Sequence, residues 1–230
     1  MKIGITERGD AGLDFSWMKY KGYKILITKN PVELLKNCYP SDFNNSIIHC
    51  TITGLGGTVY EPNVIKPTEA IDAYIKLVEM LGTERVVLRV DPIFPNEDFW
   101  LNYHKSIVEQ CISRLRISFL DMYSHVRNNL HNLYINDKHK NIHADLDIRL
   151  YYLNKIKEIY SDVEVCGEPD IECLGCISER DFKSLGIATD KIKINKNKQR
   201  DTCKCVGNKF ELLNNSQPCK HGCLYCYWYS

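Results

Sequence analysis

The sequence predicts a single-domain α/β fold, in the form of a partial (βα)6, TIM-like barrel. Short runs dense in Ile, Val and Leu alternate six times with longer segments of helical period. This alternation is typical of a parallel sheet with right-handed crossovers. The length of 230 residues is enough for one good core and short for two. An open six-unit barrel is favoured over a flat doubly wound sheet, although periodicity alone does not separate them.

Six runs are predicted to be strands because apolar residues fill most positions, as expected of strands buried on both faces. They cover residues 2–6, 24–28, 47–53, 85–90, 116–120 and 163–166. The helices predicted between them are a short one after Pro31, residues 68–81 closed by Gly82, about 98–113, 145–160 and a short last one over 179–185. Apolar residues recur at helical spacing over 68–81, so this helix packs one face on the sheet.

The composition excludes several classes of protein. Hydrophobic residues make up 44% of the chain and charged residues 26%, unlike disordered, collagen-like or coiled-coil proteins. The formal net charge of +1 gives no overall attraction to nucleic acid or to an anionic membrane. No stretch approaches the roughly eighteen apolar residues of a membrane span, and the opening MKIGITERGD lacks the apolar run of a signal peptide. We therefore expect a cytoplasmic protein without a membrane partner.

Polar residues gather where the predicted strands end. In a parallel α/β fold, function belongs to the carboxyl ends of the strands and to the loops that follow them. Arg89 and Asp91 interrupt the apolar run LRVDPIF, and Asp121 interrupts SFLDMY two residues before Tyr123. A buried charge is costly unless it pairs or binds a ligand. These four residues are therefore predicted to face a site, although each alone is equally well explained as a loop cap or a surface charge.

The segment TGLGGTVYEPN, which follows the third predicted strand, is rich in glycine. Glycine lets the backbone approach a ligand closely, so we expect Thr53, Gly54 and Gly56 to contact a nucleotide or a methionine group. The segment is not G-x-G-x-x-G followed directly by a helix, and a Rossmann dinucleotide site is only weakly supported.

Eight of the eleven cysteines lie between Cys166 and Cys226. In a chain without an export signal, such crowding indicates metal ligation rather than a disulfide scaffold, and eight is more than one cluster uses. We therefore divide the domain into βα barrel units over residues 1–165 and a cysteine-rich iron–sulfur region over residues 166–230, which closes the same domain.

Cys219, Cys223 and Cys226 have the spacing C-x3-C-x2-C. Three such thiolates can hold three corners of a cubic 4Fe-4S cluster and leave the fourth iron without a protein ligand. A zinc knuckle, which needs four ligands, and a disulfide with one spare thiol are the alternatives. The spacing resembles that of the radical S-adenosylmethionine enzymes, in which the open iron binds the amino and carboxylate groups of the cosubstrate. Tyr225 resembles the aromatic residue that usually precedes their last cysteine.

Five motifs resemble, in order and spacing, those of the domain of unknown function family 1848, a radical S-adenosylmethionine-like family. They are TITGLGGTVYEPNV, RVVLRVDPIF, ISFLDMY, NKQRDTCKC and CKHGCLYCY. The likeness extends from about residue 24 to the C-terminus. Where the family has a Ser-Arg-Arg-Thr-Asp run, this chain has TERGD, so only Arg8 and Asp10 carry over. Trp228 stands where the family usually has Ala.

The resemblance implies a circularly permuted enzyme. The cluster loop comes last in the chain instead of after the first strand, and residues 209–213 supply the strand that leads into it. The cluster is then expected at the mouth of the barrel, facing the predicted catalytic residues Arg89, Asp91, Asp121 and Tyr123. The predicted cosubstrate-binding residues are Arg8, Thr53, Gly54, Gly56 and Tyr225.

A second metal site is implied by the same resemblance. Cys166, Cys176, Cys203 and Cys205 match cysteines of the family and make a closed set of four thiolates. An auxiliary cluster that passes electrons is favoured over structural zinc at this second site. Cys173 does not match and is left as a spare.

The implied reaction is the reductive cleavage of S-adenosylmethionine to methionine and a 5′-deoxyadenosyl radical, which abstracts hydrogen from an unknown substrate. The expected partners are S-adenosylmethionine, an electron donor such as flavodoxin or ferredoxin, and that substrate. Because CLYCY is similar to the spore photoproduct lyase group, nucleic acid is retained as one substrate class. The alternative is a non-enzymatic iron–sulfur protein for electron transfer or redox sensing.

Overall fold

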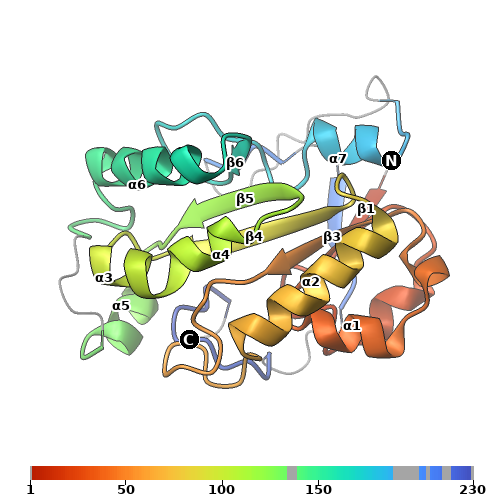
Figure 1. Ribbon diagram of the computed structural model, residues 1–230, viewed down its shortest axis with the longest axis horizontal. Helices are drawn as coiled ribbons and strands as arrows, with labels where there is room; N and C mark the ends of the chain where they lie inside the picture. Colours follow the sequence, from red (N-terminus) through yellow and green to blue (C-terminus); the bar gives the residue numbers. More distant parts are fainter. Residues whose placement is uncertain (1, 134–138, 189–201, 206–207, 214–218, 229–230) are drawn as a thin grey trace.

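The computed structural model describes residues 2–133, 139–188, 202–205, 208–213 and 219–228 of the chain. Its centre is one sheet of seven parallel strands, with helices on both sides (Figure 1). The strands are β1 (Lys2–Ile5), β2 (Lys24–Thr28), β3 (Ser46–Thr51), β4 (Val86–Ile93), β5 (Arg114–Phe119), β6 (Val163–Val165) and β7 (Asn208–Glu211). The α-helices are α1 (Pro31–Asn37), α2 (Pro67–Leu81), α3 (Glu97–Phe99), α4 (Lys105–Glu109), α5 (Ser124–Leu130), α6 (Leu146–Ile159) and α7 (Glu179–Ser184).

The strand order is β6-β5-β4-β3-β2-β1-β7. From β1 to β6 each strand lies beside the one before it in the chain, so the order never reverses as it does in a doubly wound sheet. The six predicted strands are confirmed, with ends that shift by up to three residues. β7 confirms the strand predicted over residues 209–213, and it pairs in parallel with β1. Within the described residues, β6 and β7 are the two edges and the sheet is not closed.

The main apolar core lies between the sheet and helices α1, α2, α4 and α6 (Figure 1). Leu26, Leu88 and Leu115 from three strands are fully buried there, together with Tyr74 of α2 and Ile156 of α6. Full burial of a side chain of this kind stabilises the fold by roughly 1.5–3 kcal/mol. This layer carries most of the packing and leaves the opposite face of the sheet for the site.

The opposite face is apolar at one end and charged at the other. Ile25 and Ile47 pack there against Phe182 of α7. Farther along the sheet, Arg114 and Arg116 of β5 are buried beside Glu164 of β6: Arg114 Nε lies 2.9 Å from Glu164 Oε1, and Arg116 Nε donates to Glu164 Oε2 at 2.9 Å.

Helix α7 is tied to the same charged group. Its Asp181 lies 2.8 Å from Arg114 Nη2, and Ser178 caps the helix by accepting from the Asp181 N–H. Charges buried this deeply are tolerated only when they are paired. The two arginines and two carboxylates therefore fix α7 against this face of the sheet, here called the inner face.

The helix predicted over about 98–113 is interrupted. It consists of α3, a π-helical turn over Trp100–His104 and α4, which ends at Glu109. The turn places the fully buried His104 between two loops: its Nε2 accepts from the Phe94 N–H at 3.0 Å, and its Nδ1 lies 2.7 Å from the Thr53 carbonyl oxygen. Burial lowers the pKa of His104 to about 4, so the neutral ring donates from Nδ1 and joins the ends of β3 and β4.

Helix α5 was not predicted from the sequence. Its seven residues make barely two turns, and only Val126 and Leu130 are buried, which is too little to show a helical period. The 3-10 turns over Phe15–Lys19 and Pro40–Phe43 were missed for the same reason. α5 lies at the carboxyl ends of the strands, where it contributes to the site.

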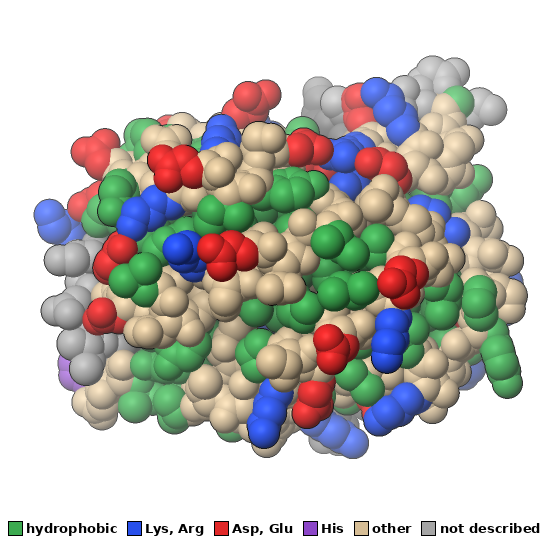
Figure 2. Space-filling view, viewed as in Figure 1, with side chains coloured by type: hydrophobic (Ala, Val, Ile, Leu, Met, Phe, Trp, Pro, Cys, Tyr) green, Lys and Arg blue, Asp and Glu red, His purple; other side chains and the backbone are tan. Residues whose placement is uncertain are grey.

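The described helices include none long and apolar enough to cross a membrane. On the face that carries α2, α4 and α6, acidic and basic side chains are interspersed (Figure 2). The described Lys and Arg residues on this face form no continuous basic area.

Replacing Glu164 by Ala is expected to destabilise the fold by about 3–5 kcal/mol, because two buried guanidinium groups lose their carboxylate. Glu158→Ala on the exposed side of α6 is the matched control and should change the free energy of unfolding by less than about 0.5 kcal/mol. Urea denaturation followed by circular dichroism measures both. Equal, small effects would contradict the structural role of the buried pairs.

Candidate active site

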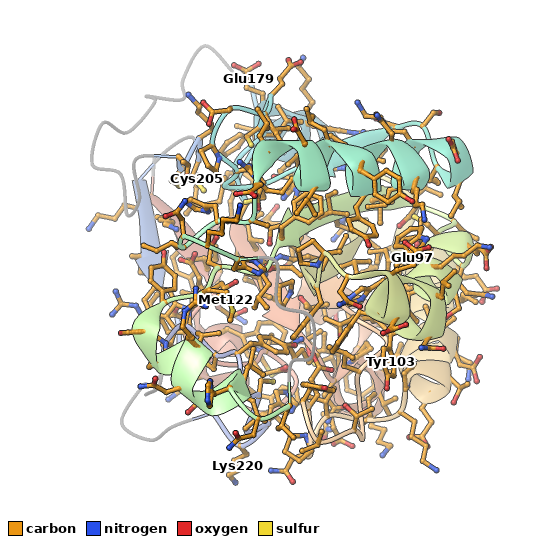
Figure 3. All side chains as sticks on the ribbon, turned by 90° about the vertical axis from the view of Figure 1, so that its left-hand side faces the viewer. Glu97, Tyr103, Met122, Glu179, Cys205 and Lys220 are labelled. Atoms are coloured by element: carbon orange, nitrogen blue, oxygen red, sulfur yellow. The ribbon has the colours of Figure 1, made fainter. Side chains whose placement is uncertain are left out.

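A pocket of about 440 Å³ opens at the carboxyl ends of the strands. Residues at the ends of β1 to β6 line it, and the cysteine loop, residues 219–228, covers one side. Figure 3 shows Cys205 and Lys220 well apart on opposite sides of the molecule. The two cysteine-bearing segments therefore reach the pocket from different directions.

The cysteine loop is held by backbone and side-chain contacts from the segment after β3. Asn63 Nδ2 donates to the Lys220 carbonyl oxygen at 3.0 Å, and the Asn63 N–H donates to the His221 carbonyl oxygen at 3.2 Å. The Leu224 N–H donates to the Tyr60 carbonyl oxygen at 3.1 Å. Cys219, Cys223 and Cys226 all line the pocket from this fixed loop.

His221 ties the cysteine loop to the end of β1. Its Nε2 lies 2.7 Å from Asp10 Oδ2, and both residues are buried. Thr28 Oγ1 donates to the other Asp10 oxygen at 2.6 Å. Burial acts to raise the pKa of Asp10, but the bonds from His221 and Thr28 outweigh it and hold the pKa below its usual range. Asp10 is therefore an ionised anchor for the loop.

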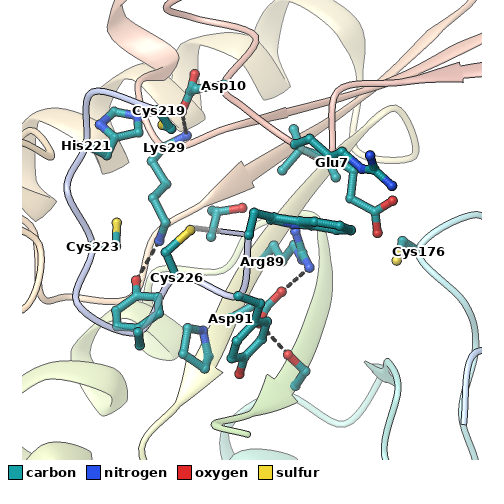
Figure 4. A pocket seen from close by; sticks show the side chains of 18 of the residues that line it. Glu7, Asp10, Lys29, Arg89, Asp91, Cys176, Cys219, His221, Cys223 and Cys226 are labelled. Carbon is teal, nitrogen blue, oxygen red and sulfur yellow. Dashed lines mark hydrogen bonds and ion pairs between the residues drawn. The ribbon is translucent and has the colours of Figure 1, made fainter. Parts of the chain in front are cut away.

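Lys29, after β2, connects the loop to the glycine-rich segment (Figure 4). Its Nζ lies 2.8 Å from Glu61 Oε1 and donates to the Tyr225 hydroxyl at 2.9 Å. Thr53 Oγ1 donates to the same Glu61 oxygen at 2.9 Å, and Tyr225 also donates to it. Burial works to lower the pKa of Lys29, but Glu61 and Cys223 outweigh it and raise the pKa, so Lys29 is a buried cation beside the cysteine loop.

Aromatic residues form the base under the cysteine loop. Tyr225 is buried and meets Phe94 edge to face, with ring centroids 5.7 Å apart. Tyr227 packs edge to face on Tyr123 at 5.5 Å, and its hydroxyl accepts from the Asp121 N–H at 2.8 Å. Tyr123 thus positions the loop and does not itself line the pocket.

Arg89 and Asp91, both on β4, form an ion pair in the middle of the pocket, and Ser118 of β5 donates to Asp91. Figure 4 shows the pair between Cys226 and Cys176. Burial acts to lower the pKa of Arg89, but Asp91, followed by Cys176, Cys166 and Glu7, outweighs it and raises the pKa. Arg89 is therefore a permanent cation next to the second group of cysteines.

Cys166, Cys176, Cys203 and Cys205, here called the second thiol set, lie together. The Sγ atoms of Cys166 and Cys176 are 3.6 Å apart, and Cys205 contacts both Cys176 and Cys203. The bond from Cys205 lowers the pKa of Cys203 to about 6, whereas the contact with Cys176 raises the pKa of Cys166. Metal ions bind the thiolate form of cysteine, so the lowered pKa of Cys203 favours ligation at that residue.

In the described part of the chain, no three His, Cys, Asp or Glu side chains already converge on the position of a single metal ion. A four-iron cluster requires a different arrangement of its ligands, in which each thiolate binds a different iron. Burial raises the pKa of Cys223 to about 12 and Lys29 opposes this shift. The three loop cysteines line one cavity and are all thiol donors, so their chemistry fits such a cluster.

Glu168, after β6, is a buried carboxyl group at the edge of the pocket. It accepts from the Phe119 N–H at 2.8 Å, and Arg149 Nη1 lies 3.2 Å from its other oxygen. Burial raises its pKa to about 7, against the lowering effect of these two donors. Nearby, Asp121 lies 2.7 Å from Nδ1 of His143 and raises the pKa of that imidazole.

The structure brings most of the predicted site residues into one pocket. Those that line it are Arg8, Arg89, Asp91, Asp121, Tyr225, Cys166, Cys176, Cys203, Cys219, Cys223 and Cys226. Those that are described but do not line it are Thr53, Gly54, Gly56, Tyr123 and Cys205. The motif NKQRDTCKC is described only over its last four residues, 202–205.

The glycine-rich segment has a packing role in the structure. A Cβ atom on Gly54, whose φ is 88°, would lie 2.5 Å from the Tyr103 carbonyl oxygen. One on Gly56 would lie 2.0 Å from the Ile65 carbonyl oxygen. Both glycines are needed for close backbone approach within the protein, and their contact with a cosubstrate stays a prediction.

Two residues that hold the site together were not singled out from the sequence. Glu61 lies inside the glycine-rich motif and His221 lies between two of the loop cysteines. Their roles depend on partners far along the chain, Lys29 and Asp10. A buried acid and a basic partner can be guessed individually, but sequence spacing does not show which ones meet.

Comparison with known proteins gives one match. A family model described as "Domain of unknown function (DUF1848)" matches residues 21–228. No curated protein and no solved structure matches the chain.

The raised pKa of Glu168 predicts a pH-dependent stability. The neutral carboxyl group contributes fully below its unfolded pKa of 4.5, and this contribution is lost as the pH rises through about 7. Between these values wild type is expected to lose up to roughly 3 kcal/mol of unfolding free energy that Glu168→Gln retains. Denaturation of the metal-free proteins at pH 5 and pH 8 measures the difference, with the exposed Glu172→Gln as control. Parallel pH profiles for wild type and Glu168→Gln would contradict the assignment.

Proposed function

Because the chain belongs to the DUF1848 family, whose description assigns no activity, we propose from the site itself that it is a radical S-adenosylmethionine iron–sulfur enzyme. One observation carries the proposal. Cys219, Cys223 and Cys226 line a 440 Å³ pocket at the carboxyl ends of the parallel strands β1 to β6, where α/β proteins bind their ligands.

We propose further that the open sheet is a circularly permuted partial (βα)6, TIM-like barrel. The support is the strand order, which runs in one direction and adds β7 beside β1. β7 ends at Glu211, and the cysteine loop begins at Cys219. The loop thus follows the strand at one edge of the series, as the cluster loop of an unpermuted enzyme follows its first strand.

A 4Fe-4S cluster is assigned to Cys219, Cys223 and Cys226. When bound, it supplies the low-potential electron that cleaves S-adenosylmethionine to methionine and a 5′-deoxyadenosyl radical. An external donor such as flavodoxin or ferredoxin is the expected source of this electron. The substrate is the molecule from which the radical abstracts hydrogen, and nucleic acid stays one candidate substrate class.

The residues of the chain supply placement and exclusion of water. Asp10 and Asn63 fix the cysteine loop against β1 and the segment after β3. Lys29 places a buried positive charge beside Cys223, which favours the thiolate form that metal binding needs. Tyr225 is held by Lys29 and Glu61 and closes the base of the pocket. These fixed contacts need no reorganisation when ligands arrive.

The second thiol set is assigned to an auxiliary cluster in preference to structural zinc. The support is that Cys166, Cys176 and Cys203 line the same pocket as the cysteine loop, a distance over which the proposed clusters would exchange electrons. Cys166 directly follows β6, and Cys203 and Cys205 precede β7. A metal bound there joins the two edges of the sheet and contributes folding free energy.

The two assignments predict opposite effects of two substitutions. Cys223→Ala should abolish the release of 5′-deoxyadenosine and remove about four irons, while the melting temperature changes little because the core lies elsewhere. Cys203→Ala should lower the melting temperature clearly, because it opens a metal cross-link between the sheet edges. Protein reconstituted without oxygen, reduced with dithionite and supplied with S-adenosylmethionine is assayed by chromatography and differential scanning fluorimetry.

Cys111→Ala is the control. Cys111 packs against the main apolar core, so this variant should retain the full iron content. An unstable Cys223 variant beside a stable, inactive Cys203 variant would mean that the two roles are reversed. A wild-type protein that binds iron but releases no 5′-deoxyadenosine would contradict the enzyme assignment and favour the non-enzymatic iron–sulfur protein.

A further inference from the structure

The hydroxyl group of Thr51 indicates a ligand subsite in the pocket. Thr51 is the last residue of β3, is only 4% exposed and lines the pocket. Its Oγ1 has no hydrogen-bond partner among the described protein atoms. Leaving a buried hydroxyl group unpaired is costly. The hydroxyl is therefore a donor and acceptor held ready for something that enters the pocket.

Arg89 is the neighbour of Thr51 on the adjacent strand β4. Thr51 and Arg89 are register partners in the parallel ladder of β3 and β4, and both side chains line the pocket. Among the described residues, the Arg89 side chain makes its polar contact with Asp91, as an ion pair. Ser118 donates a hydrogen bond to Asp91 and holds that carboxylate in place. A guanidinium group has five N–H donors, so Arg89 has donors left over after it pairs with one carboxylate.

The other buried guanidinium groups near the pocket have less capacity to spare. Arg116 donates to Glu164, to the Cys176 carbonyl oxygen and to His49. Arg149 is bonded to Glu168 and to the carbonyl oxygens of Ala144 and Pro169. Of the two arginines that line the pocket, Arg8 stacks over the Trp228 ring at 4.7 Å, whereas Arg89 is oriented by the Asp91 carboxylate and has N–H donors open to a second one.

We propose that Thr51 and Arg89 form the subsite that binds a carboxylate group of the substrate, with Asp91 and Ser118 as positioning residues. Only the identification of this ligand as the enzyme's substrate rests on the proposed function. An edge of a guanidinium group beside a hydroxyl group matches the planar, two-oxygen geometry of a carboxylate. A monoanion fits better than a phosphate dianion, because Asp91 and Glu7 already place negative charge near Arg89.

The position of Arg89 separates this carboxylate from that of S-adenosylmethionine. The charges that act on Arg89 after Asp91 are those of Cys176, Cys166 and Glu7, on the side of the second thiol set. Lys29 is influenced first by Glu61 and Cys223, on the side of the cysteine loop, and only after them by Asp91. A cosubstrate bound at the cysteine loop leaves Arg89 for the second ligand.

Isothermal titration of oxygen-free protein with butyrate, its neutral analogue butyramide and inorganic phosphate tests the subsite. Butyrate should bind at least about tenfold more tightly than butyramide or phosphate. Thr51→Val and Arg89→Lys should each weaken butyrate binding about tenfold, since each removes one hydrogen bond to a charged group. Saturating S-adenosylmethionine should leave butyrate binding unchanged.

Thr6→Val is the matched control. Thr6 is also buried, but its hydroxyl group donates to the Ile27 carbonyl oxygen and accepts from the Ile27 N–H, and it does not line the pocket. This variant should melt at a lower temperature and bind butyrate as wild type does. Thr51→Val should show the opposite pattern, with an unchanged or higher melting temperature and weaker binding.

Equal binding of butyrate and butyramide, or butyrate binding that Thr51→Val leaves intact, would overturn the subsite. Tighter binding of phosphate would overturn the choice of a carboxylate. Competition between butyrate and S-adenosylmethionine would assign the subsite to the cosubstrate instead. A protein that binds butyrate as expected but neither holds iron nor binds S-adenosylmethionine would refute the proposed function and leave the carboxylate subsite standing.

Discussion

The pairing of β7 with β1 is the constraint on which the site depends. Four residues of each strand pair in register, and the Glu211 side chain accepts from the backbone N–H groups of Glu7 and Arg8 at 2.9 and 2.8 Å. This contact returns the C-terminal part of the chain to the carboxyl edge of the sheet. The cysteine loop can then reach Asp10, Lys29 and Asn63, which come from three successive strand ends. Without β7 at the edge, the loop cysteines and the strand-end charges would not share a pocket.

The inner face of the sheet, which packs against α7, is far more polar than the outer face, which packs against α1, α2, α4 and α6. Its charges occur as pairs: Arg114 and Arg116 with Glu164, and Arg89 with Asp91. Such pairs contribute little net stability compared with apolar packing, but each partner becomes costly once the other is removed. The outer core therefore stabilises the fold, and the inner face is free to present charged groups at fixed positions. On this face Thr51 lines the pocket, and its hydroxyl group has no hydrogen-bond partner among the described residues.

The sequence was most informative about the strands and about which residue types gather at their ends. Strands buried on both faces read as apolar runs, so β2 was predicted with its observed bounds, and charges inside such runs marked Arg89, Asp91 and Asp121. The short helix α5 and the π-helical turn at His104 leave no periodic signal. Partner choice was also hidden: Glu61 and His221 are fixed by Lys29 and Asp10, which lie 32 and 211 residues away. Glycine content predicts Thr53, Gly54 and Gly56 as ligand contacts, which stays a prediction, and the structure adds that both glycines allow close backbone approach within the protein.

In the proposed enzyme, a cluster on Cys219, Cys223 and Cys226 has an iron to which S-adenosylmethionine binds directly. Electron paramagnetic resonance of the reduced protein, recorded with and without the cosubstrate, tests it most directly. We expect saturating S-adenosylmethionine to change the spectrum of this cluster, since direct ligation alters the electronic environment of the iron, and we expect no such change in the Cys223→Ala variant. A cluster spectrum that is the same with and without S-adenosylmethionine would contradict direct ligation.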